Sequence, residues 1–454
     1  MPDRTTLDGA CMTNTPSSDT LPVGAIATPM ETSRLIYVNL FGFAIGYYWS
    51  GLTSILLPQK ILQFVSLSSK GTVLGVITAV GSVILIVLEP IAGVLSDRSQ
   101  SRLGKRKPFM LAGTLGMGLF LILMLLSPRY WMFFASFLVL KVFWAFAEGT
   151  YPALMPDVVP ESQRGKASGY LGLLSMSGAI AGVFIDGKLL AHPELLNRWF
   201  GLAPLLGAGI ATFLVVVVCM IFIWFKIEEP ILPAPPRSER NPILEAFELR
   251  PLFQQQAFLL LTTSRMLWYF GFNSIMAFLL FYVKDGLRRA DYVNATSDLM
   301  AVLWITALPT VLTAGWFSDR IGRRKPFVYV SGLLMMTAVV GFIFLHSYPH
   351  IMAAMALWGF GGGIFFSVTW AMGTECFPEL GSNARYLAIW ISLSQGVPWL
   401  IGPPIAGILM DHWGFRVLFL FVMVCFLLGM ASFYPVSETG WRSKTALTPA
   451  MYAK

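Results

Sequence analysis

The sequence predicts an all-α, polytopic membrane protein whose twelve transmembrane helices form two pseudo-symmetric bundles of six. The chain of 454 residues is 56% hydrophobic and 12% charged, whereas soluble domains are about 25% charged. Apolar runs of about 20 residues, long enough to cross a bilayer, recur along the chain. A basic turn also occurs twice, as GVLSDRSQSRLGKRKP at 93–108 and as GWFSDRIGRRKP at 315–326.

The continuous apolar runs place the spans and exclude a β-barrel, which would show short alternating segments. We expect the spans at 35–57, 71–95, 109–127, 131–155, 168–187, 200–225, 257–282, 298–317, 327–346, 351–374, 386–409 and 415–435. The resulting regions are a Thr-, Ser- and Pro-rich disordered tail at 1–33, an N-terminal bundle at 34–226, a Pro-rich linker at 227–256 with a short helix near 242–249, a C-terminal bundle at 257–436 and a second tail at 437–454.

The net charge of +8 is explained by topology. With both termini in the cytoplasm, most of the 32 Lys and Arg residues fall on the cytoplasmic side, as the positive-inside rule requires. We therefore expect no nucleic-acid partner, and a monomer in the plasma or inner membrane. The four cysteines lack metal or disulfide spacing. Neither a catalytic triad nor a phosphate-binding loop is present, so we expect no enzyme activity, no metal and no cofactor.

The doubled turn carries a family resemblance. Each copy joins the second and third spans of its half, and a weaker echo, PDVVPESQRGKA at 156–167 against ECFPELGSNAR at 375–385, follows each fourth span. The chain resembles the major facilitator superfamily over nearly its full length. SDRSQSRLGKRKP at 96–108 is similar to the S-D-R-x-x-S-R-x-G-R-R-R-P turn of its glycoside/sucrose-cation symporter group. This resemblance implies two bundles that alternate access to a central site for a small molecule.

The acids of the doubled turn suit a cytoplasmic gate. A carboxylate near the N-terminus of a neighbouring helix meets its positive dipole end, and by the family's architecture Asp97 would face the span that starts near 383–385, while Asp319 would face the span that starts near 165–168. The alternative for the bases is that they only satisfy topology and contact anionic lipid. The expected gate residues are Gly93, Asp97, Arg98, Arg102, Gly104, Arg106, Asp157, Arg164, Gly315, Asp319, Arg320, Gly322, Arg323, Glu375 and Arg385.

Three ionisable residues at membrane depth are candidates for ion coupling, because such residues are costly there. They are Glu89, Glu148 and Arg265. In melibiose-type symporters a second acid, four residues before the one that matches Glu89, helps to bind sodium; that position is Leu85 here. A hard cation needs several oxygen ligands, so we expect a proton in preference to sodium. The alternatives are a structural role for Glu89 and snorkelling for Arg265.

Large aromatic side chains and two amides at mid-span depth suit the apolar faces and hydroxyl edges of a sugar. The candidate substrate-binding residues are Tyr48, Trp144, Trp268, Asn273, Trp304, Trp370 and Gln395. The same walls would accept lipophilic compounds. The fourth-span Arg-Ala-x-x-x-Asp of sucrose carriers has Pro152 at the arginine position, which argues against sucrose itself.

These observations predict a secondary active transporter for a small polar solute, most consistent with a proton-coupled sugar symporter in the lipid bilayer. One alternative is an exporter of drugs or metabolites, although the fifth span lacks the Gly-Pro turn of drug/proton antiporters. An alternative of another class is a membrane sensor or assembly factor that transports nothing.

Overall fold

The computed structural model describes residues 30–99, 101, 103–194, 203–229, 256–375 and 390–436. Within them, twelve helices are long and apolar enough to cross a membrane. The prediction of an all-α protein with twelve spans is therefore confirmed. The helix expected near 242–249, almost all of the N-terminal tail and the C-terminal tail lie outside the described residues.

The first half contains six spans, here called the N bundle. They are α1 (Thr32–Gly51) continued by the π-helical turn η1 (Leu52–Leu56) and α2 (Leu57–Ile61), α3 (Lys70–Asp97), α4 (Lys107–Leu126), α5 (Tyr130–Val158), α6 (Arg164–Ala191), which follows the 3₁₀ turn η2 (Glu161–Gln163), and α8 (Pro204–Lys226). Within the bundle α1 packs on α6 and α8, and α5 packs on α3 and α4.

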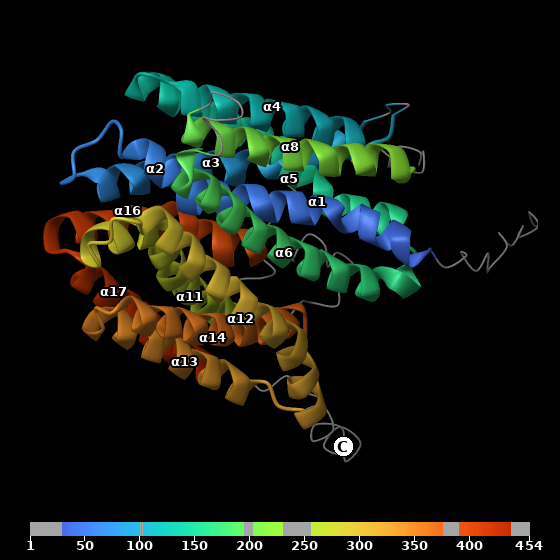
Figure 1. Cartoon of the computed structure of the whole chain (residues 1–454). Helices are drawn as coiled ribbons and strands as arrows, with labels where there is room; N and C mark the ends of the chain where they lie inside the picture. Colours follow the sequence, from blue (N-terminus) through green and yellow to red (C-terminus); the bar gives the residue numbers. More distant parts are fainter. Residues whose placement is uncertain are drawn as a thin grey trace, which may run out of the picture.

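The second half, the C bundle, repeats this plan. Its spans are α11 (Gln256–Phe281) continued by the π-helical turn η3 (Tyr282–Gly286), α12 (Tyr292–Ile321), α13 (Lys325–Phe344), α14 (Tyr348–Glu375), the π-helical turn η4 (Ser392–Gly396) leading into α16 (Val397–Trp413), and α17 (Phe415–Phe433). The first span of each half thus contains a π-helical turn in its later part, as expected for duplicated halves. Figure 1 shows the blue-to-green and yellow-to-red helices as two neighbouring groups.

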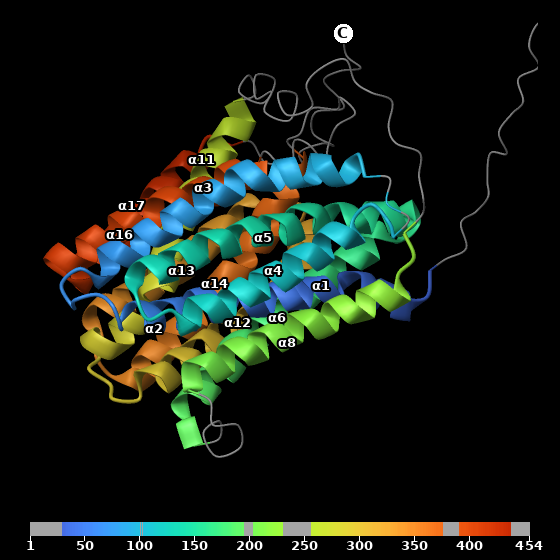
Figure 2. The same ribbon diagram turned by 90° about the horizontal axis from the view of Figure 1, so that it is seen from above.

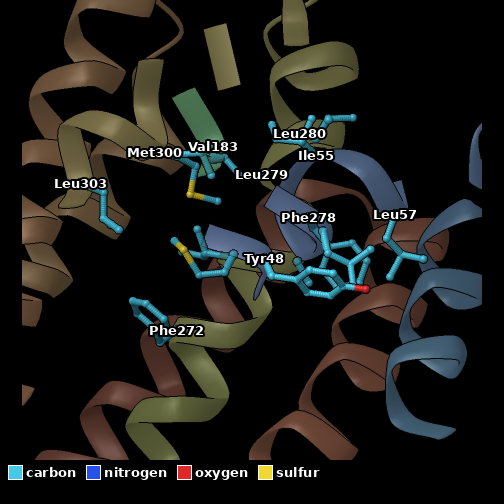
Figure 3. Close-up of a cluster of buried hydrophobic side chains, with 14 of the residues drawn as sticks. Tyr48, Ile55, Leu57, Val183, Phe272, Phe278, Leu279, Leu280, Met300 and Leu303 are labelled. Atoms are coloured by element: carbon cyan, nitrogen blue, oxygen red, sulfur yellow. The ribbon is translucent and has the colours of Figure 1, made fainter. Parts of the chain in front are cut away.

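The bundles touch mainly along two helix pairs, α3 with α16 and α6 with α12, and α11 also contacts η1 and α2. Figure 2 shows α3 and α16 side by side. We call the two ends of the molecule the Asp97 end, which also carries Asp319, and the Lys70 end. A buried hydrophobic cluster runs through both bundles, and near the Lys70 end it includes Val183 of α6 and Met300 of α12 (Figure 3).

The bundles meet closely at the Lys70 end because small residues lie at both contacts. A Cβ on Gly407 of α16 would lie 2.2 Å from the carbonyl oxygen of Gly71, and a Cβ on Gly187 of α6 would lie 1.5 Å from Ser297 Oγ of α12. Toward the Asp97 end, α6 has nothing within 4 Å of the Cβ positions of Gly165 and Gly172. Among the described residues the bundles are therefore joined at the Lys70 end and diverge toward the Asp97 end.

Candidate functional site

A cavity of about 510 Å³ lies between the two bundles. It falls within the range of about 300–1,000 Å³ that is usual for small-molecule sites. Its walls come from α1, η1, α2, α3, α5 and α6 on one side and from α11, α12, α14, η4 and α16 on the other. Both halves contribute to it, so relative movement of the bundles would change the cavity.

The N-bundle wall carries three charged side chains, Glu89 of α3 and Lys141 and Glu148 of α5. The two helices approach closely here, since a Cβ on Gly149 would lie 2.7 Å from the carbonyl oxygen of Glu89. The acids therefore sit at the same depth on adjacent helices. Glycine after Glu148 is what permits this approach.

Trp144 links Lys141 to Glu148. Its indole Nε1 donates a hydrogen bond to the Glu148 carboxylate, while the Lys141 ammonium lies 4.5 Å from the centroid of its ring. Lys141 and Glu148 lie two helical turns apart, which is too far for a direct ion pair, and the Trp144 ring therefore connects them. Such a cation–π contact is stronger where water is excluded.

Glu89 forms neither an ion pair nor a side-chain hydrogen bond with any described residue, yet the charges of Glu148 and Lys141 act on it. Two carboxylates and one ammonium leave a formal charge of −1, which one bound proton would neutralise. Pro90 follows Glu89 inside α3 and, lacking an N–H, frees the carbonyl of Ile86, another cavity residue. The wall therefore offers an unpaired acid and a free acceptor.

The C-bundle wall is aromatic with one unsatisfied amide. Asn273 of α11 is fully buried beside the cavity, and neither its Oδ1 nor its Nδ2 has a partner among the described residues. Tyr269, Phe272, Trp304 and Phe366 also line the cavity, and the rings of Trp304 and Phe366 both contact that of Phe272. A buried amide without partners costs free energy, so a ligand that supplies both a donor and an acceptor would recover it.

Two of the cavity segments are π-helical turns. Thr53 lies in η1, and Ser392 and Gln395 lie in η4. A π turn widens the helix and weakens its regular hydrogen bonding, and such turns occur frequently at functional sites. Hydropathy alone gives no signal for them.

The cavity brings together six of the expected coupling and substrate residues. They are Glu89, Trp144, Glu148, Asn273, Trp304 and Gln395. Sequence reasoning did not assign Lys141 to the site, although its position in an apolar run marked it as unusual. It also missed Trp49, Phe137, Tyr269, Phe272, Phe366 and Trp399, which line the cavity.

Three expected substrate residues face elsewhere, which corrects their placement. Tyr48 is fully buried and donates its hydroxyl hydrogen to the Met117 carbonyl at 3.0 Å. Trp268 stacks on Phe365 in the core of the C bundle, with ring centroids 4.3 Å apart. Trp370 is 39% exposed, outside the described cavity lining. Depth along a span was predicted for these rings, but not the face of the helix.

Arg265 does not snorkel to a surface and does not line the described cavity. It is 1% exposed, and its guanidinium lies 4.3 Å from the Trp390 ring centroid and 5.5 Å from that of Tyr269. Nη1 donates to Thr369 Oγ1 at 2.9 Å. It is thus one turn from the cavity residue Tyr269, held on aromatic faces.

The doubled turn folds into the same ion pair twice, within each bundle. Arg106 pairs with Asp97, and its Nε donates to Asp157 Oδ2 at 3.0 Å. In the C bundle Arg324 pairs with Asp319 at 3.0 Å. Arg324, and not the exposed Arg323, therefore occupies the position of Arg106.

The other expected gate residues vary in placement. Gly104 and Gly322 have positive φ values of 105° and 70°, which favour glycine, and a Cβ on Gly315 would lie 3.0 Å from Ser367 Oγ. A Cβ on Gly93 would make only an ordinary contact, 3.6 Å from the Gly149 carbonyl oxygen. Arg98, Arg164 and Arg320 are exposed.

The contacts of Asp97 and Asp319 across the bundles stay predictions. Arg102, Arg385 and the helix start near 383–385 lie outside the described residues, as does the side chain of Glu375. The segment 165–168, expected to meet Asp319, is largely exposed. This is the arrangement expected when the Asp97 end is open.

Sequence reasoning missed the polar ties at the Lys70 end. The carboxylate of Asp411 of α16 accepts hydrogen bonds from the backbone N–H groups of Gly71 and Thr72, at 3.1 and 2.7 Å, at the start of α3. Lys70 pairs with Asp285. Both contacts join the two bundles, and the contact of Asp411 is an acid-to-helix-dipole interaction of the kind that was expected at the opposite end.

A second tie joins α6 to α12. Lys188 Nζ donates to Asn294 Oδ1 at 2.5 Å and lies 3.1 Å from Asp298 Oδ1.

Outside the spans, Arg289 hydrogen-bonds Asp291 and thereby lowers the pKa of that carboxyl.

Comparison with known proteins supports one family. The profile of the family described as "MFS/sugar transport protein" matches residues 42–379. The multidrug resistance protein MdtG of Yersinia enterocolitica is 25% identical over 308 residues, which span 66% of this chain and 70% of that protein. MdtG of Salmonella paratyphi C is 27% identical over 256 residues, 55% of this chain and 58% of that protein.

Solved structures share the fold. A mutant of the nucleoside transporter NupG superposes with a TM-score of 0.69 at 12% identity, covering 88% of this chain and 100% of that one. The D-xylose-proton symporter gives a TM-score of 0.65 at 14% identity, covering 87% and 96%. At these identities the likeness concerns the fold alone.

Proposed function

Because the chain belongs to the MFS/sugar transport protein family of membrane transporters, we propose that it is a proton-coupled symporter for a sugar or a similar polar solute. The solute would bind in the cavity between the bundles, and the bundles would rock to expose it to each side in turn. The Asp97 end would face the cytoplasm, with both termini on that side. The polar ties at the Lys70 end would hold the state described above.

The unpaired carboxyl of Glu89 carries the proposal of proton coupling. It adjoins the cavity with Glu148 and Lys141, where one proton would cancel the remaining charge. Trp144 engages Glu148, so Glu89 is the acid that is free to exchange its proton. A neutral site would cross the membrane at lower cost than a charged one.

The amide of Asn273 supports a hydroxyl-bearing solute. Its unpaired oxygen and nitrogen could respectively accept from and donate to adjacent hydroxyl groups of a sugar ring. The rings of Trp304 and Tyr269, which line the same cavity, would contact the apolar face of the sugar ring. A solute without hydrogen-bonding groups would leave the amide unsatisfied.

Export of drugs is the second candidate, favoured by the relatives named multidrug resistance protein MdtG. An aromatic cavity with a formal charge of −1 also suits a lipophilic cation. A proton and a cation would then compete for Glu89, which is the requirement for antiport.

Both candidates are tested in liposomes that contain the purified chain. An acidic exterior is imposed, and uptake of mono- and disaccharides and nucleosides is compared with extrusion of lipophilic cations. Symport predicts that external acid accelerates uptake of one class of polar solute. Antiport predicts that the same gradient expels a preloaded cation. If every solute crosses the membrane under this gradient only as fast as in protein-free liposomes, both the symport and the antiport proposals are contradicted.

A further inference from the structure

A second buried carboxyl lies outside the central cavity. Asp186 of α6 is fully buried between α1 and α8. Tyr47 Oη of α1 donates to Asp186 Oδ1 at 3.1 Å, and Thr212 Oγ1 of α8 lies 2.9 Å from Asp186 Oδ2. A Cβ on Gly51 would lie 2.2 Å from Oδ2, so the carboxyl is tightly enclosed.

No described cation faces this carboxyl. From α1 it meets the titratable Tyr47, and from α8 the uncharged Thr212. Lys188, two residues on, is bound to Asn294 and Asp298 of α12. An ionised Asp186 would thus be a buried charge without compensation, which is unfavourable.

The hydrogen bonds are satisfied if Asp186 carries a proton. Thr212 has one hydroxyl hydrogen, and its Oγ1 also lies 3.0 Å from the Ala208 carbonyl oxygen. With a proton on Oδ2, Asp186 donates to Thr212, Thr212 donates to Ala208, and Tyr47 donates to Oδ1. Every oxygen in the cluster then has a partner.

Asp186 adjoins the contact that closes the Lys70 end. The next residue, Gly187, packs against Ser297 of α12, and Lys188 holds Asp298. Separation of α6 from α12 would release both contacts and bring water to the face of α6 that adjoins Asp186, which would lower the cost of ionising the carboxyl.

We propose that Asp186 is a second proton-binding site, protonated while the Lys70 end is closed and deprotonated when that end opens. It would link proton release to opening at the end opposite Asp97. The release of the proton on opening rests on the proposed function, whereas the protonation of Asp186 in the closed state is independent of any solute.

Infrared spectroscopy tests the protonation directly. The reconstituted full chain and Asp186→Asn are compared at neutral pH in H₂O and D₂O, with Glu89→Gln as the matched control. We expect the carbonyl-stretch band of one protonated carboxyl to be lost in Asp186→Asn. In Tyr47→Phe, which keeps the carboxyl, this band should persist and move, because its carbonyl loses a donor. Loss of carboxylate bands in Asp186→Asn, with no loss of a protonated band, would overturn the proposal.

Distance measurements test the link to opening. Spin labels are placed at Leu67 and Trp413, both exposed near the Lys70 end, in a background without the four native cysteines. Raising the pH should increase the population with a long distance in the parent, and Asp186→Asn should keep the short distance throughout. An identical pH response in both would refute the link. If no solute is transported but the protonated carboxyl is found, the proposed function fails and this site stands.

Discussion

Replacing Gly407 by alanine should open the Lys70 end. The added Cβ would lie 2.2 Å from the Gly71 carbonyl oxygen, where ordinary contacts begin at 3.4 Å. The Cβ is fixed to the backbone of α16, and the atoms that it meets are backbone atoms of α3. Rotation of a side chain therefore cannot relieve the clash. The strain exists only while α3 and α16 touch, because opening this end separates them.

The magnitude follows from the cost of overpacking. Extra methyl groups in well-packed interiors typically cost about 1–3 kcal/mol. Since the cost applies to one of two states, the equilibrium should shift toward opening by about 5–150-fold. Gly172→Ala is the matched control, because nothing lies within 4 Å of its Cβ position on α6.

Thiol labelling measures this shift. A single cysteine replaces Ser82, which lines the cavity, and a membrane-impermeant reagent is applied from the Lys70 side. Gly407→Ala should raise the labelling rate within the range above, and Gly172→Ala should not raise it. Equal rates for Gly407→Ala and the parent, with both proteins folded, would refute the assignment of α3 and α16 as the closed contact.

Three further results are expected. Asp411→Asn should increase labelling by the same reagent about 2–30-fold, because a carboxylate at a helix N-terminus contributes about 0.3–2 kcal/mol; an unchanged rate would contradict this role. Trp144→Phe, which keeps the ring but loses the donor to Glu148, should shift the pH profile of transport while solute affinity stays similar, and an unchanged profile would count against the assignment. The lowered pKa of Asp291 means that its bond to Arg289 stabilises the fold above the ordinary pKa of aspartate and loses this effect as pH falls through the lowered value. Arg289→Gln should therefore slightly lower the Tm at pH 7 and have no effect at about pH 2, and an equal decrease at both values would contradict the ion pair.

Much of the fold could be predicted because the bilayer imposes a length on each span and the chain repeats its basic turn. The acids Glu89 and Glu148 could also be found, since a charge inside an apolar run is conspicuous. The sequence did not predict that Arg106 would be the partner of Asp97. The turn contains several basic residues, and only the fold determines which of them forms the ion pair.

There is a physical reason why the direction in which the aromatic side chains point could not be predicted. In a soluble helix polar residues mark the outer face, but a membrane helix is apolar toward both lipid and protein. Tyr48 and Trp268 therefore had the right depth and the wrong face. The tie between Asp411 and α3 was missed because it joins segments 340 residues apart, whose proximity depends on how the bundles dock.

The most direct test of the central claim compares accumulation with exchange in Glu89→Gln. A solute identified in the liposome panel is followed under an inward proton gradient, and then as exchange between equal concentrations without a gradient. We predict that the variant loses accumulation but retains exchange, because a permanently neutral residue permits the bundles to move with solute and no longer carries a proton. Accumulation by Glu89→Gln at the rate of the parent chain would contradict proton coupling through this cavity.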